Sequence, residues 1–271
     1  MSFDASTDRR LNLPAEVSGA GKPAWLNVPI ADLRPKPNKA TGIDTQLIFG
    51  TPLLMFSQAG SFTWVQSKID SYVGYIETAA LTFGEISSTH KVIVPRTFRY
   101  SLPDMKTPHF DALSIGSAVC IVEHAETRGT KYAILNDGSA VIANHLSAIG
   151  EYLKDPVTVA ETLLHTPYLW GGVSAFGIDC SGLVQLSLAM CGTKVLRDTD
   201  MQAATIGRPI TKAELQRGDL VFWKEHVAFY RGDGTIIHAN GHTMSVAIEG
   251  LEDAINRISY LYGQPTLYKR P

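Results

Sequence analysis

The sequence predicts an α+β chain in which two small β-barrels precede a domain built from a buried helix and an antiparallel sheet. Three observations predict this fold class. Short apolar runs separated by Gly, Asn, Asp and Ser fill residues 25–150, a pattern typical of small barrels rather than of strand–helix–strand units. The order of these runs occurs twice. Beyond residue 150 a helical pattern precedes paired strands. We therefore expect domains at 1–86, 87–150 and 151–271.

The first ~25 residues contain several Pro and Gly residues and are expected to form an extended lead-in. The two sets of strand-like runs span roughly 30–85 and 88–148. Clear examples are Gln46–Gly50, Thr63–Gln66, Tyr72–Ile76, Lys91–Pro95, Ser117–Val122 and Lys131–Leu135. The repeated order predicts that each set forms one barrel.

In the third domain, Asp155 followed by Pro156 predicts a helix start, with an acceptor side chain at the cap and Pro at the first helical position. This helix is expected to run to about His165. A second helix over 181–190 is apolar on most faces and is therefore expected to be buried. Strands are expected at 218–223, 226–230 and 235–239, and the dipeptide at 233–234 predicts a hairpin between the last two.

The charge balance excludes several functional classes. The 271 residues include 24 basic and 26 acidic side chains, for a formal net charge of -2. This balance gives no electrostatic basis for binding nucleic acid or an anionic membrane. No run approaches the ~20 apolar residues that a membrane helix needs, and the polar N-terminus lacks the apolar stretch of a secretory signal. We expect a cytoplasmic protein.

Three cysteines argue against a disulfide framework and fit a reducing compartment. Cys120 and Cys191 lie in apolar surroundings and are expected to be small buried hydrophobic residues. Cys180 lies instead where a Gly-containing loop enters the second helix. The helix dipole and the free backbone N–H groups are expected to lower the pKa of its thiol. The same N–H groups are suited to hold an oxyanion.

A cysteine nucleophile needs a base, and that base needs a group that orients it. His226 opens one predicted strand, and His238 lies near the end of the next. Neighbouring antiparallel strands place side chains across from each other. We therefore expect His238 to bond the ring of His226 and fix its tautomer.

The third domain resembles the NlpC/P60 family. The resemblance is carried by five short motifs in the family's order and at compatible spacing. They are Tyr168-x-Trp170-Gly171-Gly172, Asp179-Cys180-Ser181-Gly182-Leu183-Val184, Gly218-Asp219-Leu220-Val221-Phe222-Trp223, His226-Val227-Ala228 and Ile237-His238-Ala239. The resemblance implies a papain-like α+β core and a Cys180–His226–His238 triad.

The upstream half resembles the bacterial SH3 modules that precede this domain in the γ-D-glutamyl-L-diamino-acid endopeptidases of murein peptide recycling. The cues are Asp32-Leu33-Arg34, Thr45–Gly50 and Asp70–Ile76 before Leu81. The resemblance implies that an aromatic residue of the first module closes a pocket for the substrate's amine, and Tyr72 is the candidate. Where relatives often carry Gly-Glu, this chain has Gly50-Thr51, so the acidic partner of that pocket is not identified.

The resemblance implies a cysteine peptidase acting on a small murein-derived peptide, L-Ala-γ-D-Glu-diamino acid. The bond cut is the amide between the γ-carboxyl of D-Glu and the diamino acid. Asp179 is expected to bind the free ammonium of L-Ala, because a carboxylate beside the nucleophile suits a cation at a fixed distance. Ser181 is expected to add a polar contact, and the Tyr168 hydroxyl is expected near the oxyanion. No cofactor, metal, nucleic acid or membrane partner is expected.

Other interpretations remain open for these residues. Asp179 suits a helix cap, Tyr72 suits a barrel core, and one Cys with two His suits a zinc site, although the spacing does not match a zinc finger. The chain as a whole is also compatible with an amidase or acyltransferase acting on another amide, or with a murein-binding module without catalysis.

Overall fold

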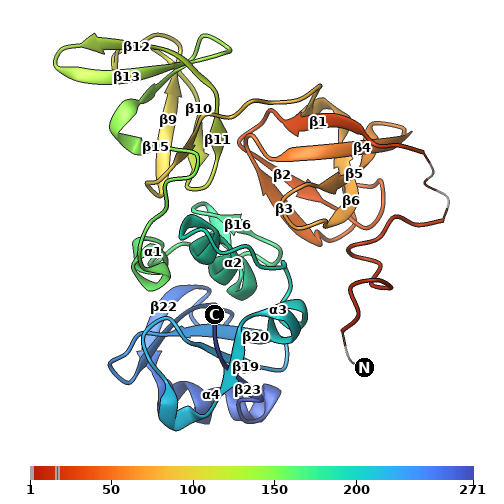
Figure 1. Cartoon of the computed structure of the whole chain (residues 1–271), viewed down its shortest axis with the longest axis vertical. Helices are drawn as coiled ribbons and strands as arrows, with labels where there is room; N and C mark the ends of the chain where they lie inside the picture. Colours follow the sequence, from red (N-terminus) through yellow and green to blue (C-terminus); the bar gives the residue numbers. More distant parts are fainter. Residues whose placement is uncertain (1–2, 16, 18) are drawn as a thin grey trace. The chain divides into compact units, whose positions relative to one another are not determined.

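The computed structural model describes residues 3–15, 17 and 19–271 and contains two compact units (Figure 1). One unit comprises residues 6–151, and the other comprises residues 152–271 together with residues 3–5. The start of the second unit lies one residue from the predicted boundary. Within the described residues, no helix is long and apolar enough to cross a bilayer.

The first half of the N-terminal unit consists of seven strands and one short 3-10 helix, η1 (Thr78–Ala80). Five strands form a sheet in the order β6-β5-β4-β1-β7, and β2 pairs with β3 in a separate ribbon. The strands are β1 (Lys22–Leu26), β2 (Ile30–Leu33), β3 (Thr45–Ile48), β4 (Pro52–Ala59), β5 (Phe62–Ser67), β6 (Val73–Glu77) and β7 (Leu81–Phe83).

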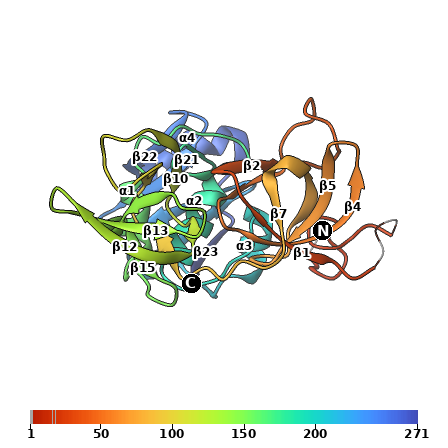
Figure 2. The ribbon, with the colours of Figure 1, turned by 90° about the horizontal axis from the view of Figure 1, so that it is seen from above.

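The second half has eight strands and the 3-10 helix η2 (Ala143–His145). Its sheets have the orders β10-β9-β14-β13-β12 and β11-β8-β15, and β12 and β13 form a long hairpin visible in both views (Figure 1, Figure 2). The strands are β8 (His90–Val92), β9 (Arg96–Tyr100), β10 (His109–Ser114), β11 (Ala118–Val119), β12 (Ile121–Thr127), β13 (Thr130–Leu135), β14 (Ala140–Ile142) and β15 (Leu146–Ala148).

The two halves share the order of elements that the sequence repeats. In each half a 3-10 helix leads into the last strand, and that strand pairs antiparallel with the first (β1 with β7, β8 with β15). None of the sheets formed by the described residues closes on itself, so each predicted SH3-like barrel is built from open sheets. Register shifts in the β4–β5 and β12–β13 pairs and the separate β2–β3 ribbon interrupt the ladders.

The two halves also pack against each other through a shared apolar cluster. Phe49 of the first half lies in one cluster with Val92 and Leu113 of the second, and its carbonyl accepts a hydrogen bond of 3.0 Å from the Ala118 N–H. A Cβ on Gly50 would lie 2.0 Å from the Ala118 carbonyl oxygen, so the close approach of the backbones requires glycine there. A domain boundary at 86/87 stays a prediction.

The C-terminal unit is α+β with an antiparallel sheet, as predicted. Its six-stranded sheet has the order β18-β23-β19-β20-β21-β22, and β16 pairs with β17. The helices are α1 (Pro156–Thr162), α2 (Cys180–Met190), α3 (Thr199–Thr205), α4 (Leu251–Tyr262) and the 3-10 helix η3 (Lys212–Glu214). The strands are β16 (Val173–Ser174), β17 (Gly177–Ile178), β18 (Arg208–Ile210), β19 (Leu220–Trp223), β20 (His226–Tyr230), β21 (Thr235–Asn240), β22 (Ser245–Gly250) and β23 (Leu267–Arg270).

Helices cover both faces of this sheet (Figure 1). The buried side chains of α4 pack with Val221, Ala228 and Ile236 on one face. Since side chains alternate along a strand, buried neighbours such as Phe229 and Ile237 face the other way, where α2 contacts β20 and β21. The N-terminal end of α2, which carries Cys180, therefore approaches the sheet from the side opposite α4.

Candidate active site

Cys180 is the first residue of α2, and two glycines let the loop before it pack tightly. A Cβ on Gly182 would lie 2.3 Å from the Gly172 carbonyl oxygen, and a Cβ on Gly172 would lie 2.5 Å from the Gly177 oxygen. Only glycine permits such close approach of two backbone segments. The motif glycines therefore fix the helix entrance against the loop that precedes it.

The Cys180 sulfur lies against the backbone on both sides of His226. Its Sγ is 3.9 Å from the Glu225 carbonyl oxygen, and the Val227 N–H also hydrogen-bonds it. These backbone groups are available because the ladder between β20 and β21 pairs only Phe229 and Tyr230 with their partners. The two strands separate at the His226 end, and the sulfur occupies the edge that this separation leaves open.

The rings of His226 and His238 meet across the separated strands. His226 Nε2 lies 2.8 Å from His238 Nδ1, a hydrogen bond. The observed register pairs Phe229 with Ile237, so the two histidines meet diagonally rather than as direct cross-strand partners. The predicted pairing of the two rings is present, and both side chains are buried, with exposed fractions of 8% and 1%.

A carboxylate that the sequence did not reveal lies behind His238. His238 Nε2 is 2.8 Å from Glu249 Oε1 on β22, a close contact that is too bent for a well-aligned hydrogen bond, and Arg257 of α4 donates to both oxygens of Glu249. Burial lowers the pKa of both histidines below the ordinary value of 6.5, most strongly for His226. Burial raises the pKa of Glu249, but the hydrogen bonds from His238 and Arg257 more than offset this and set it at about 2.

The expectation that the helix end lowers the pKa of Cys180 is wrong. Burial of the thiol, followed by the neighbouring Asp179 carboxylate, raises its pKa to about 11. The hydrogen bonds from Thr199 and Val227 and the charge of Arg197 act in the opposite direction but do not compensate. A thiolate with an exposed fraction of 6% loses more hydration than the helix end returns. The thiol and the imidazole of His226 are therefore both neutral at pH 7.

Asp179 and Ser181 have partners inside the protein. The Asp179 carboxylate caps α2 by accepting from Gly182 N–H at 2.7 Å and accepts from Gly171 N–H at 2.8 Å. It also forms a two-pronged ion pair with Arg197, at 2.7 and 3.0 Å. The Ser181 hydroxyl donates to Asp179 and accepts from Arg197. Only 10% of the Asp179 side chain is exposed, so its proposed contact with an ammonium group stays a prediction.

Arg197 and Thr199 complete the nucleophile's surroundings and were missed by the sequence analysis. Arg197 is 1% exposed, and Thr199 Oγ1 lies 3.8 Å from the Cys180 sulfur. Both residues lie around the start of α3, a helix that the sequence analysis did not assign. Arg197 lies among other charged residues, Lys194, Asp198 and Asp200, so the sequence carries no signal that distinguishes it as the buried one.

Tyr168 lies close enough to Cys180 and Asp179 for their charges to act on it. Burial, and then those two charges, raises the pKa of the Tyr168 hydroxyl well above its ordinary value of 10.0. This hydroxyl therefore stays protonated and able to donate a hydrogen bond. Tyr72 belongs to the other compact unit, where it is buried at 2% exposure. A substrate contact by either tyrosine stays a prediction.

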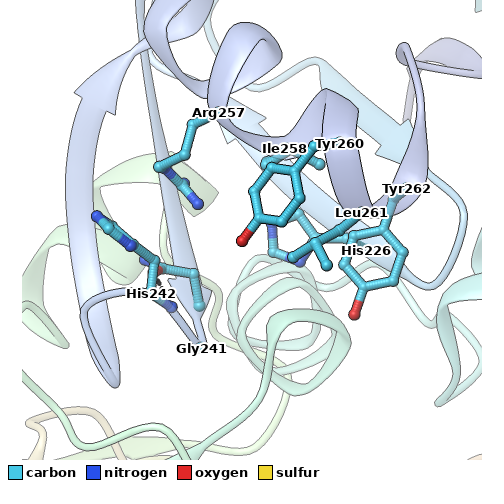
Figure 3. Close-up of a pocket in the computed structure, with 9 residues that line it drawn as sticks. His226, Gly241, His242, Arg257, Ile258, Tyr260, Leu261 and Tyr262 are labelled. Carbon is cyan, nitrogen blue, oxygen red and sulfur yellow. Dashed lines mark hydrogen bonds between the residues drawn. The ribbon is translucent and has the colours of Figure 1, made fainter.

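A cavity of about 350 Å³ opens beside His226 (Figure 3). It is lined by the end of β21 with the loop that follows and by the C-terminal half of α4. The lining residues are His226, Asn240, Gly241, His242, Arg257, Ile258, Tyr260, Leu261 and Tyr262. Arg257 is the only residue of this set with a permanent charge, and the set contains no carboxylate. The cavity therefore adjoins the proposed base, and its wall carries little net charge because Arg257 is paired with Glu249.

The alternative of a zinc site finds no matching geometry. The nitrogens of His226 and His238 that face each other are hydrogen-bonded to one another. Across the described residues, no group of three or more His, Cys, Asp and Glu side chains is arranged to hold a metal ion.

Comparison with known proteins identifies two regions. Residues 165–262 match the NlpC/P60 family, and residues 33–81 match the bacterial dipeptidyl-peptidase SH3 domain. The chain is 26% identical over 201 residues to dipeptidyl-peptidase 6 of Lysinibacillus sphaericus, covering 74% of this chain and 71% of that protein. It is 25% identical over 270 residues to the gamma-D-glutamyl-L-lysine dipeptidyl-peptidase of Bacillus cereus, covering 87% of this chain and 80% of that protein.

One solved structure extends the likeness of fold over most of the chain. The crystal structure of an NlpC/P60 family protein from Bacillus cereus has a TM-score of 0.78 at 21% identity, covering 92% of this chain and 99% of that one. The fold class predicted from the sequence is confirmed by this likeness and by the two matched regions.

Proposed function

Since residues 165–262 belong to the NlpC/P60 family of cysteine peptidases and residues 33–81 are a bacterial dipeptidyl-peptidase SH3 domain, we propose that this enzyme hydrolyses murein stem peptides. The bond cut is the γ-D-glutamyl–diamino acid amide of a peptide with a free N-terminal L-Ala. The observation that carries the proposal is the Cys180 sulfur at the backbone flanking His226, whose ring bonds His238. Names of relatives such as gamma-D-glutamyl-L-lysine dipeptidyl-peptidase support the substrate class.

The reaction starts from a neutral pair. His226 uses Nε2 to bond His238, which leaves Nδ1 for the thiol proton. As the sulfur attacks the γ-glutamyl carbonyl carbon, its proton passes to Nδ1 and the carbonyl oxygen becomes an oxyanion. The sulfur loses its proton only as it forms the bond to the carbonyl carbon. A raised thiol pKa is therefore compatible with nucleophilic attack.

The oxyanion is held by the N-terminal end of α2 and by Tyr168. Cys180 is the first residue of α2, so the backbone N–H groups of this helix end are proposed donors, and the protonated Tyr168 hydroxyl is a second proposed donor. Collapse of the tetrahedral intermediate breaks the C–N bond, and His226 returns its proton to the departing amine. Water then attacks the thioester with His226 as base, which releases the acyl product and restores the thiol.

The cavity beside His226 receives the leaving group. The departing amine must lie next to the proton on His226, and this residue forms one wall of the cavity. The opposite side of the nucleophile then receives D-Glu and L-Ala, with Asp179 and Ser181 as the proposed contacts and Tyr72 as a further proposed contact.

We place the reaction in the cytoplasm, as a step of murein recycling. Cys120, Cys180 and Cys191 are all free thiols, which fits a reducing compartment. If the enzyme requires an unblocked N-terminal amine, it selects stem peptides that have already been released from murein.

The test is hydrolysis of L-Ala-γ-D-Glu-L-Lys and of its meso-diaminopimelate counterpart, each with a free or an N-acetylated L-Ala. We expect cleavage of the free peptides at the γ-glutamyl bond, a kcat/KM lowered by more than 100-fold for the acetylated peptides, and no turnover by Cys180→Ala. The matched control is Cys191→Ala, which retains full turnover. Equal cleavage of free and acetylated peptides would remove the amine requirement, and turnover by Cys180→Ala would remove the nucleophile.

A further inference from the structure

Behind the two histidines, Glu249 and Arg257 continue the series of side-chain contacts that begins at His226. His226 Nε2 bonds His238 Nδ1 at 2.8 Å, and His238 Nε2 contacts Glu249 Oε1 at 2.8 Å. Arg257 approaches the same carboxylate from α4, with its Nε 3.2 Å from Oε2 and its terminal nitrogen on Oε1. β20, β21, β22 and α4 each contribute one member of this series.

The series fixes the tautomer of each ring. An ionised carboxylate only accepts hydrogen bonds, and an unprotonated ring nitrogen would present its lone pair to the negative oxygen 2.8 Å away. The His238 nitrogen that faces Glu249 therefore carries the proton, although the contact is bent away from ideal hydrogen-bond geometry. The other nitrogen of a neutral His238 must then accept, and it accepts from His226 Nε2. The proton of His226 is therefore on Nε2, and its Nδ1 keeps the lone pair that abstracts the thiol proton.

We infer that Glu249, held in place by Arg257, is a positioning residue that sets the His226 tautomer through His238 and stabilises the imidazolium formed during attack. The inference extends the proposed Cys180–His226 chemistry. It goes beyond the triad, because the carboxylate touches neither the nucleophile nor the base.

The charges around the two rings determine the sign of each expected effect. The Glu249 carboxylate raises the pKa of both histidines, whereas Arg257 lowers it. His242, in the loop after β21, also lowers the pKa of His238, and each histidine ring adjoins the other. Removing the carboxylate must therefore lower both histidine pKa values, and removing the guanidinium must raise them.

Glu249→Gln and Arg257→Gln are the test variants, and Glu252→Gln is the matched control. Glu252 lies three residues after Glu249, at the start of α4, but its side chain is 69% exposed and pairs only with Lys212 among the described contacts. We expect Glu249→Gln to lower kcat by about 10- to 100-fold with little change in KM, because a glutamine amide accepts either tautomer of His238. The acid limb of kcat/KM moves to lower pH in Glu249→Gln and to higher pH in Arg257→Gln, and it is unchanged in Glu252→Gln.

A second measurement is independent of turnover. Nitrogen-15 NMR of the histidine rings in the full chain reports the tautomer and the pKa of each ring without substrate. We expect the wild type to carry protons on Nε2 of both histidines, and Glu249→Gln to show a mixture. Wild-type rings with protons on Nδ1, or limbs that shift in the same direction in both variants, would overturn the inference.

The two readouts separate this inference from the proposed function. If the wild type does not cleave murein peptides but shows the expected tautomers and opposite pKa shifts, the positioning role stands and the substrate is wrong. If activity falls in proportion to a lowered melting temperature while tautomers and pKa values stay unchanged, Glu249 has only a structural role and the inference fails.

Discussion

Two carboxylate–arginine pairs flank Cys180 and His226, and they differ in burial and in what they contact. On the nucleophile side, Asp179 pairs with Arg197, whose side chain is 1% exposed. On the base side, Glu249 pairs with Arg257, and about a quarter of each side chain is exposed. The first pair bonds backbone groups of the α2 entrance, whereas the second contacts an imidazole. A carboxylate–arginine pair thus anchors backbone groups near Cys180, whereas a pair of the same type contacts the ring of His238 near the proposed base.

The nucleophile side is expected to keep its thiol neutral, and this gives the largest expected effect. Because burial raises the pKa of the Cys180 thiol to about 11, nearly all of it is protonated at pH 7. Alkylation by iodoacetamide is therefore expected to be slow at pH 7 and to rise about tenfold per pH unit. Site-resolved mass spectrometry measures this rate, with Cys191 in the same sample as the reference. A rate already at its plateau at pH 7 would mean a preformed thiolate–imidazolium pair.

Breaking the buried pair is expected to cost more stability than breaking the exposed one. Asp179→Asn leaves the Arg197 guanidinium buried without a charged partner, which typically costs about 3–5 kcal/mol. Glu249→Gln leaves Arg257 with access to solvent, and we expect a loss of about 1 kcal/mol or less. Urea unfolding of both variants measures the difference. Equal losses would show that the two pairs do not differ in the way their burial implies.

The third prediction concerns Tyr168, which we propose as a donor of a hydrogen bond to the oxyanion on the side of Cys180. Tyr168→Phe removes a hydroxyl that stays protonated, and removal of one such donor typically lowers kcat by about 10²-fold or more. We expect KM to stay within a few-fold of the wild-type value, because the charge that the hydroxyl meets exists only in the transition state. Tyr152→Phe, on a tyrosine with 57% exposure, is the control. An unchanged kcat in Tyr168→Phe would assign this residue to packing.

The base side is expected to destabilise the fold in acid. His226 and His238 have pKa values below 6.5 when folded, so the unfolded chain binds more protons than the native state once the pH falls below about 6.5. Stability therefore decreases as the pH drops from 6.5 toward the lowered folded values, by up to about 1.4 kcal/mol per pH unit for each histidine. Urea midpoints between pH 7 and 5 measure this slope.

The comparison variants for this slope are His238→Asn and His165→Asn. His238→Asn removes one titrating group and must reduce the slope. His165 is exposed with a φ of 66°, a conformation that asparagine tolerates well, so His165→Asn makes the same substitution while leaving both buried histidines in place. Equal slopes in the wild type and His238→Asn would show that this histidine is not held neutral.

Much of the fold was predictable because its signals are local. Asp155 and Pro156 define the start of α1 as expected, and its Asp155 cap accepts from Val157 N–H. The helix ends at Thr162, three residues before the predicted end, because the chain turns to bond Val246 through the His165 N–H. Helix α4 was missed even though its buried side chains recur at helical spacing: Leu251, Ala254, Ile255 and Ile258.

The candidate site was predictable only in part. Cys180, His226 and His238 lie within short motifs whose order along the chain indicates their proximity, and the structure brings the two rings together. Arg197 and Glu249 belong to no such motif. Each is identified only by the partner it meets, 18 residues away for Arg197 and Asp179 and on the neighbouring strand for Glu249 and His238.

The sequence by itself determined the kinds of elements, the cysteine at a helix entrance and the two histidines on successive strands, since each depends on residue type and spacing. Only the tertiary structure decided the protonation state of the site. Whether a thiol ionises depends on the balance between lost hydration and nearby charges, and that balance is set by side chains from α3, β22 and α4 that are distant in the chain. Burial outweighs the helix end at Cys180 because the folded protein removes water from all sides of the sulfur at once.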